Sequence, residues 1–501
     1  MAEQVVIVGA GPNGLMLACE LALAGVRPVV LDRLPGPSAE PKANGLVGQV
    51  IRQLDMRGLY RAFGGGDEPP QPAYGWMFAG LSLSFLGLED NPMYALLLPQ
   101  PRLVRLLEKR ARGLGVDIRW GNELTDFDAD DDGVGLTVRT GEHTYELTAG
   151  YLVGADGGRS MVRKNLGVAF TGHTSGIVSR LAHVHIPDDL LVPGSGYNFP
   201  GFGLLRFGQN RFEAGTIMVF ALEPDRPLIG TIEYGWTVGS ADGPMSFGEL
   251  GDSIRRIIGV DIALQAPKKP GAHALRRLDG INTRQADRYR VGRVLLVGDA
   301  AHVHSPMGGP GLNLGLQDGV NLGWKLAAVL SGRQPAELLD TYHSERFPVG
   351  ERVMLHSMAQ LALAAPGPEV RALRTLFGEL TTKSEVTEHL AHLLAGSDVR
   401  YDVGDEHPLS GRLVPDLTLD DGRRVAELLY AARPVLLDGT GGRAATAVQG
   451  WADRVEMVEG TLTDGPAAML IRPDGYVAWA CDTCTVADTD RLTTQLRRWI
   501  G

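Results

Sequence analysis

Cysteine is scarce in this sequence, and no long apolar run is present. Cys19, Cys481 and Cys484 are the only cysteines among 501 residues, so no disulfide framework is expected and a reducing compartment is favoured. No uninterrupted apolar run is long enough to cross a bilayer. The first apolar run, at residues 5–8, begins too early for a signal peptide's charged and hydrophobic regions to precede it. We expect a cytoplasmic protein without a membrane partner.

Positive charge is also in deficit. The chain has 48 Lys and Arg against 59 Asp and Glu, a formal net charge of -11. Nucleic-acid binding requires clustered Lys and Arg, so no nucleic-acid partner is expected. A small anionic cofactor remains compatible with this balance, because backbone N–H groups at a helix N-terminus bind phosphate. The length exceeds that of one compact core and predicts about three domains.

What the sequence has in abundance is glycine, with 66 residues. Three of them, Gly9, Gly11 and Gly14, follow the β-branched run Val5–Val8 and precede an apolar helical stretch from Leu15 to Ala24. The first glycine permits a tight turn, the second lets backbone approach a pyrophosphate, and the third allows close helix–strand packing. The segment predicts a βαβ unit that binds a dinucleotide.

Asp32 completes this first motif. It follows the next short apolar run, 18 residues after Gly14, where a carboxylate can bind the hydroxyl pair of a ribose. Two later strands also end in turns that contain glycine and an acid. These are residues 151–160, with Asp156, and residues 297–302, with Asp299. The first motif alone does not separate FAD from NAD, and either later turn taken singly could be a solvated loop.

The remaining pattern alternates between helix and strand. Residues 102–113 and 312–330 predict helices, and residues 351–397 are mostly helical in pattern. Turn signals at 131–133 and 140–142 predict a β-meander. Short segments rich in aromatic residues predict an antiparallel sheet over 176–280. Beyond about Asp402 a separate α/β segment begins, with strands at 434–437, 468–471 and 476–480.

Taken together, the three acid-bearing motifs resemble the fingerprints of the single-component flavoprotein aromatic hydroxylases. The most specific match is residues 304–313, His-Ser-Pro-Met-Gly-Gly-Pro-Gly-Leu-Asn, followed by residues 317–318, 321–326 and 342–346. The resemblance is strongest to the branch of aromatic polyketide hydroxylases that includes rifampicin monooxygenase, and it covers nearly the whole chain. It implies FAD as cofactor, NADPH or NADH as a transient reductant, and O2 as co-substrate.

The resemblance also implies which residues hold the cofactor. Asp32 would bind the adenosine ribose, Asp299 the ribityl chain, and Asp156 would lie near the pyrophosphate; Gln100 and Arg102 would lie along the FAD. The full expected set is Gly9, Gly11, Pro12, Asn13, Gly14, Asp32, Arg33, Lys42, Gln100, Asp156, Gly298, Asp299, Pro306, Gly308, Gly311, Leu312 and Asn313. Pro306, Gly308 and Gly309 are expected beside the reactive ring, where glycine leaves room and a helix N-terminus stabilises negative charge.

The chain departs from the family pattern at three positions. Lys42 and Gln49 stand where many members have Arg, and Pro310 replaces a common Gln. Lysine keeps the charge but loses the bidentate fork of arginine, which puts the affinity for FAD and the position of the flavin in doubt. Pro310 removes one backbone donor, so the details of flavin contact differ.

Other side chains support further hypotheses. Aromatic residues could form the walls of a flat substrate pocket. The candidates are Tyr74, Trp76, Phe78, Tyr197, Phe202 and Phe220. Cys481 and Cys484 suggest a redox pair or a metal site, but they follow the last strand and lack further ligands nearby, so two small residues in a turn and no metal are favoured. His302 and His304 are expected to be structural, because no acid can be paired with either from sequence.

The expected fold is α/β, with a Rossmann-like FAD domain at 1–175 and 281–395, an inserted antiparallel β-rich substrate domain at 176–280, and a thioredoxin-like domain at 396–501. The expected function is hydroxylation of an aromatic polyketide-like or phenolic polycycle through a flavin C4a-hydroperoxide. Alternatives are Baeyer–Villiger or antibiotic-inactivating oxygenation, a flavin oxidoreductase without oxygen insertion, and a non-enzymatic flavoprotein whose terminal domain mediates interactions. A homodimer is a further hypothesis. A second GxGxxG segment is missing, so the nicotinamide cofactor is expected to bind transiently.

Overall fold

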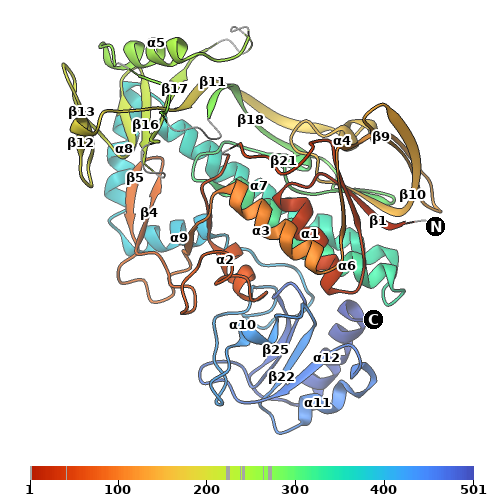
Figure 1. The fold of residues 1–501 in the computed structure, drawn as a ribbon. Helices are drawn as coiled ribbons and strands as arrows, with labels where there is room; N and C mark the ends of the chain where they lie inside the picture. The colour runs from red at the N-terminus through yellow and green to blue at the C-terminus, as the bar shows by residue number, and fades with distance from the viewer. Residues whose placement is uncertain are drawn as a thin grey trace.

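The strands at the N-terminus of the chain belong to a mostly parallel sheet (Figure 1). The computed structural model describes residues 3–40, 42–221, 226–236, 239, 243–262, 264–268 and 274–501. In this sheet the strand order is β19 (Arg290–Val291), β20 (Val294–Leu296), β10 (His143–Gly154), β1 (Glu3–Val8), β2 (Val29–Asp32) and β7 (Asp117–Trp120). The pairs from β20 to β7 are parallel, and the apolar residues of β1 are buried on both faces. That burial explains its continuous β-branched run.

Helices pack side by side against this sheet. α1 (Pro12–Leu23) contacts both α3 (Gln100–Gly113) and α6 (Pro310–Leu330), and Figure 1 shows α1 between the other two. The predicted helices at 102–113 and 312–330 are therefore confirmed with slightly earlier starts. Pro310 opens α6 as its first residue, where a missing N–H costs nothing because that donor has no intrahelical partner.

The predicted meander is also present. β8 (Asn122–Ala129) pairs antiparallel with β9 (Val134–Thr140), which pairs antiparallel with the first half of β10. The two turns lie at the Asp-Asp-Gly and Thr-Gly-Glu segments that the sequence indicated. β10 then continues into the parallel sheet, so one long strand belongs to both the meander and the cofactor sheet.

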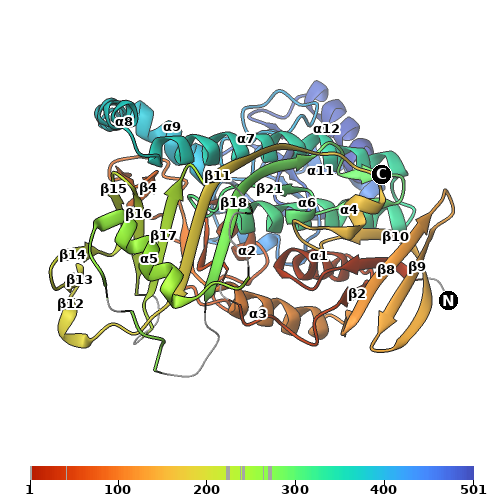
Figure 2. The same ribbon diagram turned by 90° about the horizontal axis from the view of Figure 1, so that it is seen from above.

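A second large sheet is antiparallel. Its order is β15 (Gly208–Phe212), β16 (Gly215–Phe220), β17 (Leu228–Tyr234), β11 (Phe170–His183), β18 (Leu275–Ala286) and β21 (His302–Val303). β12 (Leu191–Val192), β13 (Gly196–Phe199), β14 (Gly203–Arg206) and α5 (Phe247–Ile258) flank it. β11 and β18 are long strands that run from the cofactor domain into the insertion (Figure 2), so both cross the boundaries expected at 176 and 280.

Small elements complete the body. Two short antiparallel pairs, β3 (Gly45–Val47) with β6 (Ala95–Leu97) and β4 (Gly75–Phe78) with β5 (Leu81–Ser84), border the space between the two large sheets. The other helices of this part are α2 (Gln49–Asp55), α4 (Met161–Asn165), α7 (Asp340–Ala364), α8 (Pro368–Leu380) and α9 (Ser384–Ala395). The helical pattern expected over 351–397 thus corresponds to three helices.

The C-terminal domain has its own four-stranded sheet, with the order β23 (Glu456–Glu459), β22 (Val435–Asp438), β24 (Ala468–Ile471) and β25 (Val477–Cys481). β22 and β23 are parallel and the other pairs are antiparallel, with α10 (Val425–Leu428), α11 (Arg443–Ala447) and α12 (Val486–Trp499) around them. Its core includes Trp324 of α6 and Trp499 of α12, whose rings meet edge to face. The α/β fold class is confirmed. Within the described residues, no helix is long and apolar enough to cross a membrane.

Candidate active site

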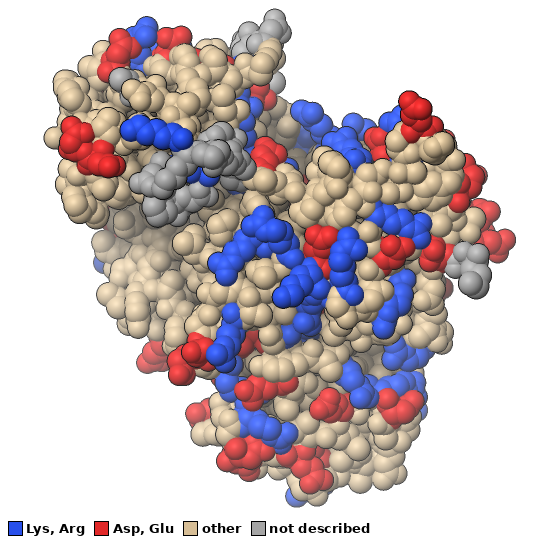
Figure 3. Space-filling model, in the orientation of Figure 1, with Lys and Arg blue, Asp and Glu red and all other residues tan. Residues whose placement is uncertain are grey.

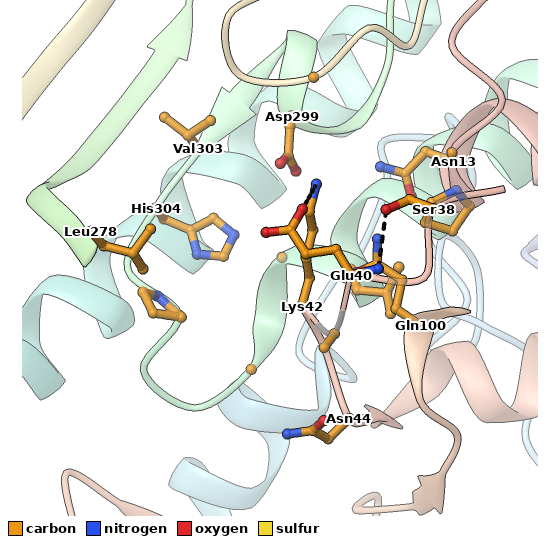
Figure 4. A pocket seen from close by; sticks show the side chains of 18 of the residues that line it. Asn13, Ser38, Glu40, Lys42, Asn44, Gln100, Leu278, Asp299, Val303 and His304 are labelled. Carbon is orange, nitrogen blue, oxygen red and sulfur yellow. Dashed lines mark hydrogen bonds and ion pairs between the residues drawn. The ribbon is translucent and has the colours of Figure 1, made fainter. Parts of the chain in front are cut away.

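A cavity of about 1100 Å³ lies between the parallel sheet and the antiparallel sheet. Its walls come from loops at the carboxyl ends of β1, β2 and β10, from α3 and α6, and from the inner face of the antiparallel sheet. Figure 4 shows Asp299 and Lys42 near its middle, with Asn13 and Gln100 on one side and His304 and Leu278 on the other. Loops at the carboxyl ends of parallel strands meet at one edge, which is why segments far apart in sequence converge here.

The glycine motif forms one end of the cavity. Gly9 has φ +112°, and a Cβ there would overlap the Ala155 carbonyl oxygen. At Gly14 a Cβ would overlap the carbonyl oxygen of Gly9, so close helix–strand packing requires glycine. At Gly11 a Cβ would meet no protein atom within 4 Å, yet the residue lines the cavity. The small size of Gly11 leaves room in the cavity. The protein's own packing does not require glycine at this position.

The N-terminus of α1 opens onto the same space. Gly11 is its N-cap, no side chain caps the helix, and the first turn contains no acid. Free N–H groups and the positive end of the helix dipole therefore face the cavity. A phosphate bound here would satisfy these donors.

Three acids are placed by three parallel strands. The Asp32 carboxylate accepts hydrogen bonds from the Ala10 N–H at 2.8 Å and the Leu34 N–H at 2.9 Å. One Asp156 oxygen accepts from the Met161 N–H at 2.7 Å, whereas the other is buried without a partner. Asp299 points into the cavity (Figure 4), and its enclosure by the protein raises its pKa. Each acid lines the cavity, and the Asp299 carboxylate is directed into it.

A buried cluster fixes the turn that carries Asp299. The Asp318 carboxylate accepts from the Gly298 N–H at 3.1 Å, contacts His302 Nε2 at 2.6 Å and accepts from Arg346 Nε at 2.8 Å. Burial alone would raise the pKa of Asp318, but His302 and Arg346 outweigh it and lower the pKa. His302 therefore has an acid partner that sequence reasoning could not place. In the sequence, Asp318 stands out only as part of the family motif at residues 317–318.

The N-terminus of α6 also borders the cavity. Gly309 is its N-cap with φ +71°, no side chain caps the helix and no acid occupies its first turn. A Cβ at Gly309 would meet nothing within 4 Å, whereas one at Gly308 would press on Gln360 and one at Gly311 on His304. Pro306, Gly308, Gly309, Gly311 and Leu312 all line the cavity. A second uncapped helix N-terminus thus faces the same space as that of α1.

His304 adds one directed acceptor. Its Nδ1 lies 3.0 Å from the Ser305 carbonyl oxygen, so Nδ1 carries the proton and Nε2 keeps a lone pair. Burial lowers the pKa of His304 to about 4, which keeps the ring neutral near pH 7. The ring lines the cavity and packs against the first turn of α6 at Gly311.

The wall contributed by the antiparallel sheet is mainly aliphatic. The lining side chains from it are Ile177, Ser179, Leu181, Gln209, Met218, Phe220, Leu228, Ile232, Arg276, Leu278 and Ile281. From other elements, Trp76, Met77, Met307, Gln360 and Leu361 complete this part. Sequence reasoning looked for flat aromatic walls and missed the aliphatic ones, since apolar residues that face a cavity resemble core residues in a strand pattern.

The aromatic expectations divide accordingly. Trp76 and Phe220 line the cavity, whereas the other four residues do not. Tyr74 is 75% exposed on the surface, and Phe78 stacks on Phe377 of α8. Tyr197 and Phe202 pack with other aromatics in a separate core cluster that includes residues of β13, β14 and α5. The expectation of a pocket role for these four is therefore wrong, because their rings are used in core packing or lie in solvent.

Most expected cofactor residues line this one cavity. Those that do are Gly9, Gly11, Pro12, Asn13, Asp32, Arg33, Lys42, Gln100, Asp156, Asp299, Pro306, Gly308, Gly311 and Leu312. Gly14 and Gly298 lie just behind its wall, and Asn313 joins the Val47 N–H at 2.9 Å to the Gly309 carbonyl at 2.8 Å. Arg102 lies outside the cavity lining with an exposed side chain.

The departures at Lys42 and Gln49 have different settings. Lys42 lines the cavity, is half exposed and lies 3.7 Å from Glu40, which also contacts Arg276 at 3.2 Å. Its ammonium remains available to an anion in the cavity. Gln49 instead donates to the Pro92 carbonyl at 3.0 Å from a buried position, outside the cavity lining.

Cys481 and Cys484 are both buried, at and just after the end of β25. Burial raises the pKa of the Cys481 thiol to about 12, which disfavours the reactive thiolate. No group of three or more His, Cys, Asp or Glu side chains suited to a metal ion occurs within the described residues.

Models of two protein families match this chain. The model of an FAD binding domain matches residues 2–357, and that of the C-terminal region of aromatic-ring hydroxylases matches residues 407–501. The chain belongs to the FAD-binding aromatic-ring hydroxylase family. This hydroxylase is 40% identical to a 12-dehydrotetracycline 5-monooxygenase/anhydrotetracycline 6-monooxygenase from Streptomyces rimosus, over 100% of the chain and 99% of the relative.

Two further relatives extend the comparison. A rifampicin monooxygenase from Streptomyces venezuelae is 39% identical, with 99% of this hydroxylase and 98% of the relative covered. The solved structure of an anhydrotetracycline hydroxylase from Streptomyces rimosus has a TM-score of 0.87 and 40% identity, covering 100% of this hydroxylase and 99% of that chain. The resemblance inferred from the motifs is therefore confirmed at the level of the family.

The cavity fits the FAD that the family binds. Two uncapped helix N-termini face it, Gly11 and Gly309 leave open space beside them, and one Asp156 oxygen lacks a partner. These features are costly or unexplained in the protein alone, because buried polar groups are normally hydrogen-bonded. Each is satisfied by an elongated, phosphate-bearing ligand with hydroxyl groups.

Proposed function

We propose that this hydroxylase inserts one oxygen atom from O2 into an aromatic polyketide-like or phenolic polycycle, with NADPH or NADH as reductant. The observation that carries the proposal is the continuity of the cavity. The end lined by Gly11 and Asp32 suits a dinucleotide, and it runs past Asp299 into an aliphatic chamber behind Pro306–Gly311. The relatives named above are monooxygenases of 12-dehydrotetracycline, anhydrotetracycline or rifampicin, which supports a polycyclic substrate.

When bound, FAD would accept electrons from the nicotinamide nucleotide and activate O2. The residues of the chain bind, orient and shield. The α1 N-terminus and Lys42 attract the phosphates, Asp32 and Asp299 accept from hydroxyl groups, and the α6 N-terminus stabilises negative charge at Gly308–Leu312. A phenolic substrate supplies its own electron pair, so no dedicated side-chain base is required.

The chamber excludes water and holds a flat, mostly apolar molecule. The apolar surface comes from four neighbouring strands of the antiparallel sheet, through Ile177, Met218, Ile232 and Ile281. Gln209 of β15 and Gln360 of α7 are polar side chains that line this part of the cavity, and their amide groups can bind carbonyl or hydroxyl groups of the substrate. Because polar groups are few, they set the orientation of the ring system more than its affinity.

The test is product mass under ¹⁸O2 with FAD-loaded enzyme, NADPH and a panel of polycyclic phenols. A product that gains one labelled oxygen on a ring carbon is the expected result. Flavin reduction without label in any product, with substrate consumed, would indicate an oxidoreductase that does not insert oxygen and would contradict the proposal.

A Baeyer–Villiger or antibiotic-inactivating oxygenation is the second candidate. It uses the same cavity, and the similarity to a rifampicin monooxygenase favours keeping it. The same labelled product distinguishes the two, because label in a new ester or lactone oxygen, and not in a phenol, identifies insertion beside a carbonyl.

A further inference from the structure

A cationic stripe runs along the exposed side of α3. Arg102, Arg105 and Lys109 recur at helical spacing and are exposed. Within the described part of the chain none of the three has an ion pair or a side-chain hydrogen bond. Figure 3 shows Lys and Arg gathered over the middle of this face, where Figure 1 draws α3.

The stripe adjoins the cavity. Gln100, Pro101 and Val104 of the same helix line the cavity wall. With 3.6 residues per turn, Arg105 follows Pro101 by about one turn, so the stripe begins beside the lining face. α3 therefore has one side in the cavity, one side in the core through Leu103 and Leu107, and one cationic side in solvent.

The stability of the helix does not explain these cations. Cations are favourable near a helix C-terminus, yet Arg102 is the third residue of α3 and Arg105 lies in its first half, and the first turn contains no acid. Arg112, by contrast, pairs with Glu108 at 2.9 Å and lies in the last turn, where a cation is favourable. In a protein with a net charge of -11, three neighbouring unpaired cations attract a polyanion.

We propose that the stripe of Arg102, Arg105 and Lys109 binds the 2′-phosphate of NADPH. The inference rests on the proposed function, which requires a nicotinamide nucleotide as reductant. The sequence has no second GxGxxG segment that could bind this nucleotide. The 2′-phosphate carries close to two negative charges and distinguishes NADPH from NADH, so the stripe selects NADPH. Transient capture by exposed side chains suits a reductant that must leave after each turnover.

The probe is 2′,5′-ADP, with 5′-AMP as its comparison, titrated calorimetrically into FAD-loaded enzyme. We expect the double variant Arg105→Glu/Lys109→Glu to bind 2′,5′-ADP at least about tenfold more weakly, with little change for 5′-AMP. The KM for NADPH should rise with kcat unchanged, and the preference over NADH should fall. Wild-type affinity for 2′,5′-ADP should also decrease more steeply with salt than that of the variant.

The matched control is Arg412→Glu/Arg443→Glu in the C-terminal domain. Both residues are exposed, have no ion pair within the described residues, and give the same change in net charge. Unchanged 2′,5′-ADP binding in the stripe variant, or equal weakening in the control, would overturn the proposal. Binding of 2′,5′-ADP is measured without turnover. The test of phosphate binding therefore gives its result even if the enzyme inserts no oxygen.

Discussion

At the scale of one residue, the Asp318 carboxylate connects three parts of the protein. It receives the Gly298 N–H from the turn before Asp299, it contacts His302 Nε2, and it pairs with Arg346 of α7. All of these groups are buried, so each depends on the others for solvation. The cavity acid Asp299 is positioned by a residue that does not itself line the cavity.

Asp318→Asn should therefore destabilise the fold and loosen the turn. The variant leaves the Arg346 guanidinium buried without its anion, which costs about 3 to 5 kcal/mol of unfolding free energy. Urea unfolding of the FAD-free protein measures that loss, and a flavin fluorescence titration measures weaker FAD binding. Asp453→Asn, at an exposed site, is the control and should change neither. An Asp318 variant as stable as wild type would contradict the cluster's role.

At the scale of an element, the start of α1 separates two uses of glycine. Gly14 is required by packing, because a side chain there would collide with the Gly9 carbonyl. Gly11 is surrounded by open cavity space, so the protein alone does not need it. The same residue type in one motif thus serves the fold at one position and the ligand at the other.

The pair Gly11→Ala and Gly14→Ala tests this division. Gly14→Ala should lower the unfolding free energy by about 2 kcal/mol or more through overpacking. Gly11→Ala should leave the FAD-free protein within about 1 kcal/mol of wild type but weaken FAD binding at least tenfold, by roughly 1.4 kcal/mol. Calorimetric unfolding with and without FAD gives both values. Equal destabilisation of the two FAD-free variants would contradict the assignment of roles.

At the scale of the whole molecule, buried charges bind the C-terminal domain to the body. Glu345 of α7 accepts from Lys325 of α6 at 2.7 Å and from Arg472 of the C-terminal domain at 2.7 Å. Burial alone would raise the pKa of Glu345, but Arg472 and Lys325 lower it to about 2. A second buried pair, Glu20 with Arg57 at 2.7 Å, reaches the Pro473 carbonyl at 2.6 Å. These ion pairs thus hold the C-terminal domain to the helices beside the cavity. The expected homodimer stays a prediction.

Glu345→Gln should weaken this junction. Lys325 would lose its anion in a buried site, whereas Arg472 would keep its pair with Asp474, and one buried charge without a partner costs about 3 to 5 kcal/mol. We expect a lower midpoint of urea unfolding and faster proteolytic cleavage between the body and the C-terminal domain. Glu213→Gln removes an exposed pair with Arg371 and should cost no more than about 1 kcal/mol. Identical proteolysis of wild type and the Glu345 variant would show that other contacts hold the domain.

Local signals determined a large part of the fold. The βαβ unit, the meander turns, the helix that became α6 and the strands of the last domain were predictable, because each depends on periodicity and turn residues within a short window. Family motifs identified the segments around Asp32, Asp156 and Asp299, and those segments do meet at one cavity. Membership of the hydroxylase family was predictable for the same reason.

What only the tertiary structure decided was which side chains face one another. Tyr197 and Phe202 carry the same local signal as Phe220, yet only Phe220 lines the cavity. The pairing of His302 with Asp318 joins residues on separate elements, and the stripe on α3 matters because the other side of that helix lines the cavity. Sequence periodicity fixes which face of an element is apolar, but the packing of distant elements decides whether that face meets a core, a cavity or solvent.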